Sequence, residues 1–391
     1  MRSIKSFVSS SRAVFFLFVI IVIAASLQSF LGGTTYFSGI ELPYTKYNNY
    51  LIFKHSFYHL LEERNLYILH PHAHHDLYKY SPTFALLFGV IAWMPDIAGL
   101  IVWNAVNAFV LIAAVYVIPG INKKTAGIIC LFVLVELLTS LQNEQSNGLM
   151  AGLIIFTYVF LEKRKYWMAA FCVVFSVYIK LFGLVALALY LLYPGKPKLA
   201  ATLLLWVTVF TLLPLIVNSP LQLIAQYGNW WEMLQNDHAD SIGISVAGLF
   251  QTWFGVNGSG KTMIMVAGIV LFCIPLVRLD QYNNNLFRRL ILASVLIWVV
   301  IFNHKAESPT FIIAVAGVAI WYFTQQSSTV NIVLLVSTLV FTSLSSTDLF
   351  PYFIRKEYFE PYAIKALPCL LVWLKINLDL MHIKKEHLLP T

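Results

Sequence analysis

Residues 13–31 read AVFFLFVIIVIAASLQSFL and carry no charged side chain. An apolar stretch of about 20 residues is long enough to cross the hydrocarbon core of a membrane. The basic residues Arg2, Lys5 and Arg12 precede it, and the stretch is longer than the apolar region of a signal peptide. We therefore predict an uncleaved first membrane span that runs from the cytoplasm outward.

The composition of the whole chain agrees with a membrane protein. Of its 391 residues 59% are hydrophobic and 11% are charged, against about 25% charged in a soluble domain; its mean hydropathy is +0.75. The net charge of +8 comes from short basic clusters at the ends of apolar runs, so it does not indicate a nucleic-acid partner. We predict an all-α polytopic integral membrane protein with about 11–13 transmembrane helices. The cysteines lie in apolar stretches, which favours core packing over disulfides or zinc; they are Cys130, Cys172, Cys273 and Cys369.

Basic clusters alternate along the chain with polar ones. The basic clusters are Arg2/Lys5/Arg12, Lys123/Lys124, Lys163/Arg164/Lys165, Lys196/Lys198, Arg278/Arg288/Arg289 and Lys384/Lys385. The polar clusters are residues 48–82, 142–147, Lys180, 236–245 and 303–309. Lys and Arg near span ends mark the cytoplasmic side. The polar clusters are then expected to meet at one site on the opposite face.

We predict a single membrane domain over residues 1–391. Its parts are a tail and first span (1–31), a large external loop (32–80), a helical core (81–217), a second external segment (218–260) and a C-terminal helical region (261–391). Amphipathic patterns predict interfacial helices near 50–61 and 221–234. One conflict is left open: if 81–94 and 97–119 both span fully, Lys123/Lys124 lie outside. Either 81–94 inserts only partially or that basic pair is an exception.

Residues 255–262, GVNGSGKT, fit the nucleotide-binding pattern G-x-x-x-x-G-K-[ST]. That loop works between a strand of a parallel sheet and a helix, and here an interfacial segment precedes it and an apolar run follows it. We therefore interpret the motif as a turn and expect no nucleotide and no cofactor.

The first loop holds His55, His59, His70, His72, His74 and His75. The tract resembles a metal site, and His55 and His59 have the i, i+4 spacing of chelating residues. No defined ligand spacing recurs elsewhere, so we expect no metal. A polar interfacial loop in which some imidazoles contact phosphate or sugar is the favoured interpretation, and an effect on metal dependence is left open.

Four of the polar clusters supply candidate site residues. Asp76, next to aromatic residues and Tyr80, is a candidate general base or an ordinary helix-start acid. Residues 142–147, QNEQSN, bring Glu144, Gln145 and Asn147, whose amides suit hydroxyl-rich ligands. Lys180 interrupts a long apolar run and is expected to face a polar cavity and a phosphate, or else to snorkel at a hairpin tip.

The fourth cluster lies between two C-terminal apolar runs. His304 and Lys305 form a cationic pair that suits a lipid phosphate, and Glu307 is a salt-bridge partner or a second acid. A plain turn is the alternative. Asp237, His238 and Asp240 are weaker candidates.

These residues resemble those of the GT-C superfamily of glycosyltransferases, and most closely family 87, the polyprenol-phosphate-mannose-dependent mannosyltransferases. The resemblance is strongest over about residues 45–195. It is carried by Tyr80-Ser-Pro-Thr-Phe-Ala-Leu-Leu87, by Trp103-Asn104 with Asn107, by Glu144-Gln-Ser-Asn147 in place of G-Q-x-N, and by Lys180. The chain departs from the family at Asn49, where an Asp usually stands as the catalytic base. The base is then Asp76 or Glu144, or the activity differs or is lost.

The resemblance implies a GT-C-like bundle and an inverting, single-displacement transfer of a hexose, with mannose expected. A polyprenyl-phosphate sugar is the donor, a lipid or glycan is the acceptor, and Lys180 and His304, with Lys305, stabilise the leaving phosphate. It implies a multi-pass protein of the inner cell membrane with its site on the extracytoplasmic face. The alternatives are a transporter or lipid flippase, which often shows internal repeats that are not visible here, and a non-catalytic scaffold.

Overall fold

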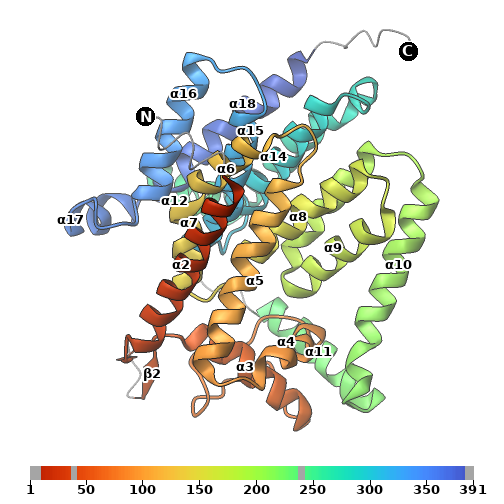
Figure 1. Ribbon diagram of the computed structural model, residues 1–391, viewed down its shortest axis with the longest axis vertical. Coiled ribbons are helices and arrows are strands. Elements are labelled where there is room, and N and C mark those ends of the chain that lie inside the picture. The colour runs from red at the N-terminus through yellow and green to blue at the C-terminus, as the bar shows by residue number, and fades with distance from the viewer. Residues whose placement is uncertain (1–9, 37–41, 237–242, 384–391) are drawn as a thin grey trace.

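The predicted all-α fold is confirmed. The computed structural model describes residues 10–36, 42–236 and 243–383, which form a bundle of helices with one antiparallel two-stranded hairpin at its lower edge (Figure 1). The N-terminal half comprises α2 (Ser11–Leu31), β1 (Thr34–Tyr36), β2 (Pro43–Thr45), α3 (Asn48–Leu61), α4 (Pro82–Ala92), α5 (Asp96–Tyr116), α6 (Lys123–Phe132), α7 (Leu134–Gln142), α8 (Asn147–Glu162), α9 (Tyr166–Ile179) and η1 (Leu181–Leu192).

The C-terminal half comprises α10 (Lys196–Leu212), η2 (Leu213–Ile216), α11 (Pro220–Asn236), α12 (Val246–Phe254), α13 (Ser259–Cys273), η3 (Ile274–Val277), η4 (Leu279–Gln281), α14 (Asn285–Ile301), η5 (Ser308–Thr310), α15 (Phe311–Phe323), α16 (Thr329–Ser337), η6 (Thr338–Leu344), α17 (Tyr352–Ile354), η7 (Arg355–Phe359) and α18 (Ala366–His382). The helices predicted near 50–61 and 221–234 are present as α3 and α11.

Among the described residues, four helical segments are long and apolar enough to cross a membrane: Ser11–Leu31, Asp96–Tyr116, Lys196–Ile216 and Ser259–Val277. A fifth crossing results if α6 and α7, which meet at a 51° bend, are taken as one span. Six further apolar helices have only 10–17 residues. A helix rises about 1.5 Å per residue, so all six are shorter than the roughly 30 Å hydrocarbon core. The total of 11–13 full crossings stays a prediction.

The position of helix α4 bears on the conflict around Lys123 and Lys124. It has 11 residues, and both of its ends lie beside α3. Near its start, the Tyr80 ring lies 4.8 Å from Phe53, and after its end Asp96 pairs with Lys54 at 2.6 Å. Both ends of α4 therefore lie on the same side of the molecule, which supports the alternative in which 81–94 inserts partially. A single crossing by α5 would then bring Lys123 and Lys124 to the end of the molecule where α2 begins.

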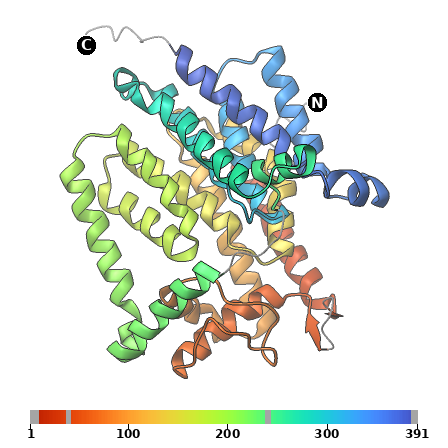
Figure 2. The ribbon, with the colours of Figure 1, turned by 180° about the vertical axis from the view of Figure 1, so that it is seen from behind.

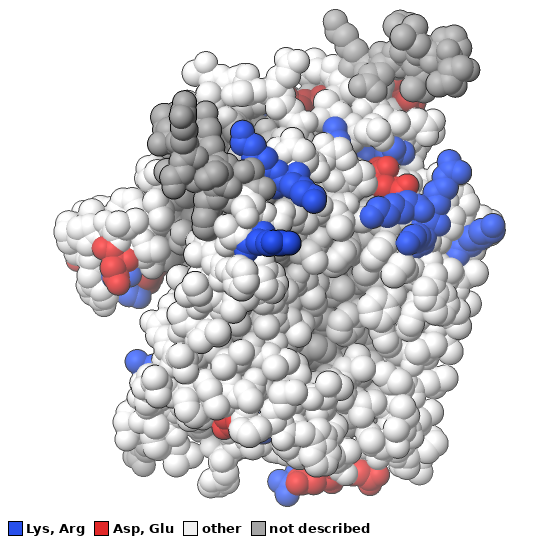
Figure 3. All heavy atoms as spheres, in the orientation of Figure 1, with Lys and Arg blue, Asp and Glu red and all other residues white. Residues whose placement is uncertain are grey.

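The two ends of the molecule differ in charge. Lys and Arg side chains form a band across the upper part of Figure 3, a wide uncharged zone lies below it, and charges of both signs reappear at the lower edge. We call the upper end the basic face and the lower end, where α3 and α4 lie, the loop face. This is the separation that a membrane protein requires. The basic residues Arg2, Lys5, Lys384 and Lys385 lie outside the described residues.

Helices α8, α14 and α15 form the centre of the bundle. In α15 every residue from Phe311 to Trp321 is buried, and α14 packs against α15 and α18. Helix α8 approaches α5 closely because Gly148 and Gly152 have no side chain; a Cβ on either would lie 2.8 Å from the α5 backbone. Small residues spaced by four allow such contacts between membrane helices.

Helix α9 and η1 form a hairpin with Lys180 at its tip. The residue has an extended backbone (φ −141°, ψ 126°) that separates the two helices. The hydroxyl of Ser81, the residue before α4, donates a hydrogen bond of 2.6 Å to the carbonyl of Tyr178. The tip therefore lies beside the start of α4, on the loop face.

Helix α10 runs along one edge of the molecule from the basic face to the loop face, where α11 crosses beneath the bundle (Figure 2). Several α10 side chains are exposed, as expected of a lipid-facing helix; Leu204 is 68% exposed. Gln226 of α11 donates a 2.6 Å hydrogen bond to the carbonyl of Arg64, which fixes α11 to the first loop.

The nucleotide-loop pattern at 255–262 links α12 to α13. Gly255 and Gly258 have positive φ angles of 68° and 53°, as turn glycines do. Among the described residues the single sheet is the hairpin of β1 and β2, so the strand that a nucleotide-binding loop requires is not there. This geometry supports the interpretation as a turn.

Candidate active site

Two cavities meet on the loop face. The first has a volume of about 250 Å³ and contains Lys79, Lys180 and Lys305; we call it the cation cavity. The second, of about 590 Å³, is lined mainly by amides and hydroxyls; we call it the amide cavity. Four residues line both, namely Asn49, Asp76, Gln145 and Glu307. The structure thus brings together side chains from α3, the first loop, the α7–α8 turn and the segment before α15.

Lys180 is held inside the cation cavity. Its ammonium donates hydrogen bonds to Asn147 Oδ1 at 2.9 Å and Gln145 Oε1 at 3.3 Å. It also lies 5.9 Å from the Tyr80 ring and 5.7 Å from the Phe182 ring. Neutral amide oxygens orient the ammonium without neutralising it, so it stays available to an anion. The expectation that Lys180 faces a polar cavity is supported, although the residue is also a hairpin tip.

The cluster at 303–309 divides between the cavity and the surface. Asn303, Lys305, Glu307 and Thr310 line the cation cavity. His304 is exposed and lines neither cavity. Lys305 is therefore better placed than His304 to act as the second cation. Asp237, His238 and Asp240 lie outside the described residues.

The candidate carboxylates occupy unusual backbone positions. Asp76 and Glu144 have φ angles of 73° and 48°, values that side-chain-bearing residues seldom adopt and that cluster at functional sites. Asp76 is half exposed, accepts a hydrogen bond from the backbone N–H of Leu77, and lies 3.6 Å from the Lys79 ammonium. It lines both cavities.

The Glu144 carboxyl, unlike that of Asp76, is buried. The residue is 1% exposed, and its backbone carbonyl accepts a 2.7 Å hydrogen bond from the indole of Trp103. Burial raises the pKa of the Glu144 carboxyl to about 8, so at neutral pH it is mostly protonated and a poor proton acceptor. Of the two proposed bases, the geometry therefore favours Asp76.

Asn49 lies where the cavities meet. Its amide donates a 3.0 Å hydrogen bond to the carbonyl of Asn143, which fixes the start of α3 to the α7–α8 turn. An amide cannot accept a proton as a base does, so the contact that the structure shows for Asn49 is this hydrogen bond between two segments of the site.

The histidine-rich loop is folded mostly away from both cavities. The rings of His59 and His70 lie 3.9 Å apart, and those of His55 and His74 each lie 6.1 Å from the ring of His59. Burial lowers the pKa of His59 to about 3 and that of His74 to about 4, so both are neutral. Among the described residues no three His, Cys, Asp or Glu side chains converge as metal ligands. Of the six loop histidines, His75 lines the amide cavity.

A third cavity of about 630 Å³ lies between α4, α5, α8, α9 and α10, and its lining is almost entirely apolar. Phe84 lines this cavity, and its ring lies 5.4 Å from Tyr80 and 5.7 Å from Phe53. Tyr80 and Phe53 line the cation cavity. Aromatic rings therefore form the wall shared by an apolar cavity among the helices and a cationic cavity on the loop face.

The model of glycosyltransferase family 87 matches residues 78–302. The match covers more than half of the chain, including Tyr80, Glu144, Gln145, Asn147 and Lys180. The chain belongs to glycosyltransferase family 87. No curated protein matches it. The protein is thus a glycosyltransferase with membrane helices, as the resemblance predicted.

Sequence reasoning missed Lys79, Phe182 and Thr310 in the site of this glycosyltransferase. They neighbour predicted residues but form no motif. It also missed the buried pair of Glu136 and Lys365. A single ionisable residue inside each of two apolar runs was the available signal.

The raised pKa of Glu144 predicts how stability depends on pH. A carboxyl whose pKa rises from 4.5 to about 8 on folding contributes stability that is complete below pH 4.5 and is lost as pH rises through 8. We expect the thermal midpoint of the purified protein to fall over this range. In Glu144→Gln, which cannot titrate, that part of the fall should vanish. The control is Asp348→Asn at an exposed position, which should keep the pH dependence of the unmodified protein. If Glu144→Gln also keeps that pH dependence, the raised pKa of Glu144 is contradicted.

Proposed function

We propose that this glycosyltransferase moves a hexose, with mannose expected, from a polyprenyl-phosphate sugar to a lipid or glycan acceptor. The observation that carries the proposal is the aromatic wall that joins the apolar cavity to the cation cavity. A lipid-linked sugar phosphate has the matching order of parts: an apolar chain, an anionic phosphate and a sugar. The chain would lie among α4, α5, α8, α9 and α10, and the phosphate beside Lys180.

The acceptor would enter by the amide cavity. Its lining includes Gln28, Gln142, Asn143 and Thr45, and amide and hydroxyl groups both donate and accept, as sugar hydroxyls require. Asp76, Asn49, Gln145 and Glu307 would surround the reacting atoms, because they line both cavities.

The reaction is a single displacement. Asp76 takes the proton of the acceptor hydroxyl, and the acceptor oxygen forms a bond to the anomeric carbon on the face opposite the leaving group. The bond between that carbon and the phosphate oxygen breaks, and its electron pair leaves with the phosphate. Lys180, with Lys79 and Lys305, stabilises the added negative charge, an effect that is large for groups oriented in advance. The anomeric configuration is inverted.

The loop face would lie outside the cytoplasm of a multi-pass protein in the inner cell membrane. The basic residues at the opposite end support this orientation, because Lys and Arg are retained on the cytoplasmic side. In this orientation no nucleotide is required.

Filling the apolar cavity tests the proposal. Val106 lines it from α5, and we expect Val106→Trp to raise KM for a long-chain polyprenyl-phosphate mannose at least about tenfold, with a smaller effect on a short-chain donor. Leu204→Trp, on the exposed side of α10, is the control. Transfer from radiolabelled donor to extracted lipid acceptors is measured in nanodiscs. Transport of the donor without transfer by the unmodified chain would overturn the proposal in favour of a transporter.

A further inference from the structure

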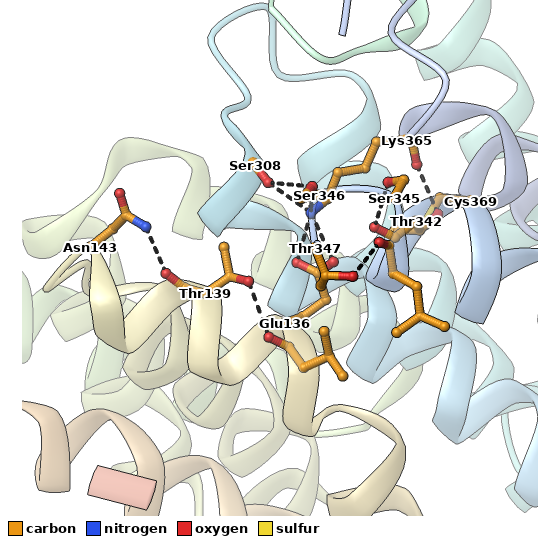
Figure 4. Close-up of polar contacts among 12 residues, drawn as sticks. Glu136, Thr139, Asn143, Ser308, Thr342, Ser345, Ser346, Thr347, Lys365 and Cys369 are labelled. Carbon is orange, nitrogen blue, oxygen red and sulfur yellow. Dashed lines mark hydrogen bonds and ion pairs between the residues drawn. The ribbon is translucent and has the colours of Figure 1, made fainter. Parts of the chain in front are cut away.

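A buried charge pair lies between α7 and the start of α18. The Lys365 ammonium is 2.8 Å from one oxygen of Glu136 and 3.0 Å from the other, and the two side chains are 6% and 0% exposed. The ammonium also donates to Ser308 Oγ at 2.8 Å and Ser346 Oγ at 3.3 Å. Figure 4 shows Glu136, Ser308 and Ser346, from three other parts of the chain, gathered around the Lys365 ammonium.

Such a pair is a poor source of stability. Removing two charges from water costs several kcal/mol per ion, and the attraction between them often only offsets this cost. Two apolar side chains at positions 136 and 365 would fill the same space equally well. The backbone is also fixed here, because Thr342 donates a 2.8 Å hydrogen bond to the carbonyl of Lys365. The pair therefore specifies positions rather than adding to packing.

Glu136, the first partner of the Lys365 ammonium, is connected to the amide cavity through α7. From Glu136 the helix α7 continues to Gln142, about 9 Å along its axis at 1.5 Å per residue, and the next three residues are Asn143, Glu144 and Gln145. The carbonyl of Asn143 holds the Asn49 amide. A rigid helical segment thus connects Glu136 with the turn that carries two site residues and orients a third.

Ser308, the second partner of the Lys365 ammonium, is adjacent in sequence to residues that line the cation cavity. Ser308 directly follows Glu307, and the N–H of Thr310 donates a 3.0 Å hydrogen bond to the carbonyl of Glu307. Both Glu307 and Thr310 line the cation cavity. The short helix η5 that begins at Ser308 packs against α7. A single ammonium therefore touches both segments that bring Gln145 and Glu307 to the junction of the cavities.

We propose that Lys365 and Glu136 form a positioning clamp that holds the α7–α8 turn and the Glu307–Thr310 turn at the separation needed for sugar transfer. The clamp includes residues outside 78–302, the region matched by the family model. Its catalytic consequence rests on the proposed function. Lys365 and Glu136 touch no substrate; they act through Gln145 and Glu307.

The test replaces the pair without leaving a lone buried charge. We expect Glu136→Gln/Lys365→Met, in the full chain, to lower kcat about 10- to 100-fold, since a displacement of about 1 Å at a site has effects of this size. KM for polyprenyl-phosphate mannose should change less than about threefold. Ser308→Ala, a milder change that keeps the charge pair, should lower kcat in the same direction. The matched control is Glu162→Gln/Arg288→Met, which removes a 2.8 Å ion pair between α8 and α14 near the basic face.

Hydrogen exchange separates the clamp from the chemistry. Without the pair we expect faster amide exchange in 143–147 and 303–310, and no change there in the control. Normal kcat with unchanged exchange in the double variant would overturn the clamp. If the unmodified protein transfers no sugar from any polyprenyl phosphate, the proposed function fails. Hydrogen exchange alone then tests the clamp. Faster exchange in the double variant supports the clamp, and unchanged exchange overturns it.

Discussion

Lys180→Met is expected to lower kcat/KM for the polyprenyl-phosphate donor by about 10²- to 10³-fold, the effect of removing a group that stabilises transition-state charge. The ammonium is oriented by Asn147 and Gln145 and lines the cation cavity. Methionine has an unbranched side chain of similar length without the charge, so the loss reports the charge. Initial rates of transfer from radiolabelled donor give the value.

A control for charge is available on the basic face. Lys198 is exposed there, and Lys198→Met should leave the rate unchanged. Native mass spectrometry of the two variants shows whether polyprenyl phosphate is still retained. If Lys180→Met transfers sugar at the normal rate, the phosphate does not bind at Lys180, and the cation assignment moves to Lys79 and Lys305.

Asp76→Asn is expected to lower kcat by about 10²- to 10⁴-fold, the range for loss of a general base, while donor binding is kept. The side chain keeps its shape and its bond to the Leu77 N–H, but it no longer accepts a proton. Because the base acts in the transition state and not in donor binding, KM should change little. Single-turnover rates and donor titration separate the two effects.

Asn49 offers a rescue of this variant. It lines the same two cavities as Asp76, so a carboxylate at residue 49 reaches the same reacting atoms. We expect Asn49→Asp/Asp76→Asn to recover part of the lost rate, and Asp348→Asn, far along the chain at a 96% exposed position, to have no effect. Full activity in Asp76→Asn alone would rule out Asp76 as the base and leave Glu307 and Glu144.

Much of the candidate site was predictable because its residues are anomalous for a membrane chain. Lys180 inside an apolar run and the six polar residues 142–147 stand out against a background that is 11% charged. The roles were less predictable. In the sequence, Asp76 and Glu144 are both carboxylic acids within polar clusters. In the structure, Asp76 is exposed beside Lys79, whereas Glu144 is buried and has a pKa near 8. Solvation separates them, and solvation depends on the surrounding fold.

The sequence by itself determined the all-α membrane class and the faces on which basic and polar residues gather, because hydropathy and charge act locally along each run. It also predicted membership in a glycosyltransferase family. Only the tertiary structure decided that both ends of α4 lie on the same side of the molecule, that His304 stays outside the cavities, and that Lys365 meets Glu136. These outcomes depend on contacts between segments far apart in the chain, and a local pattern does not encode which distant segment will lie beside it.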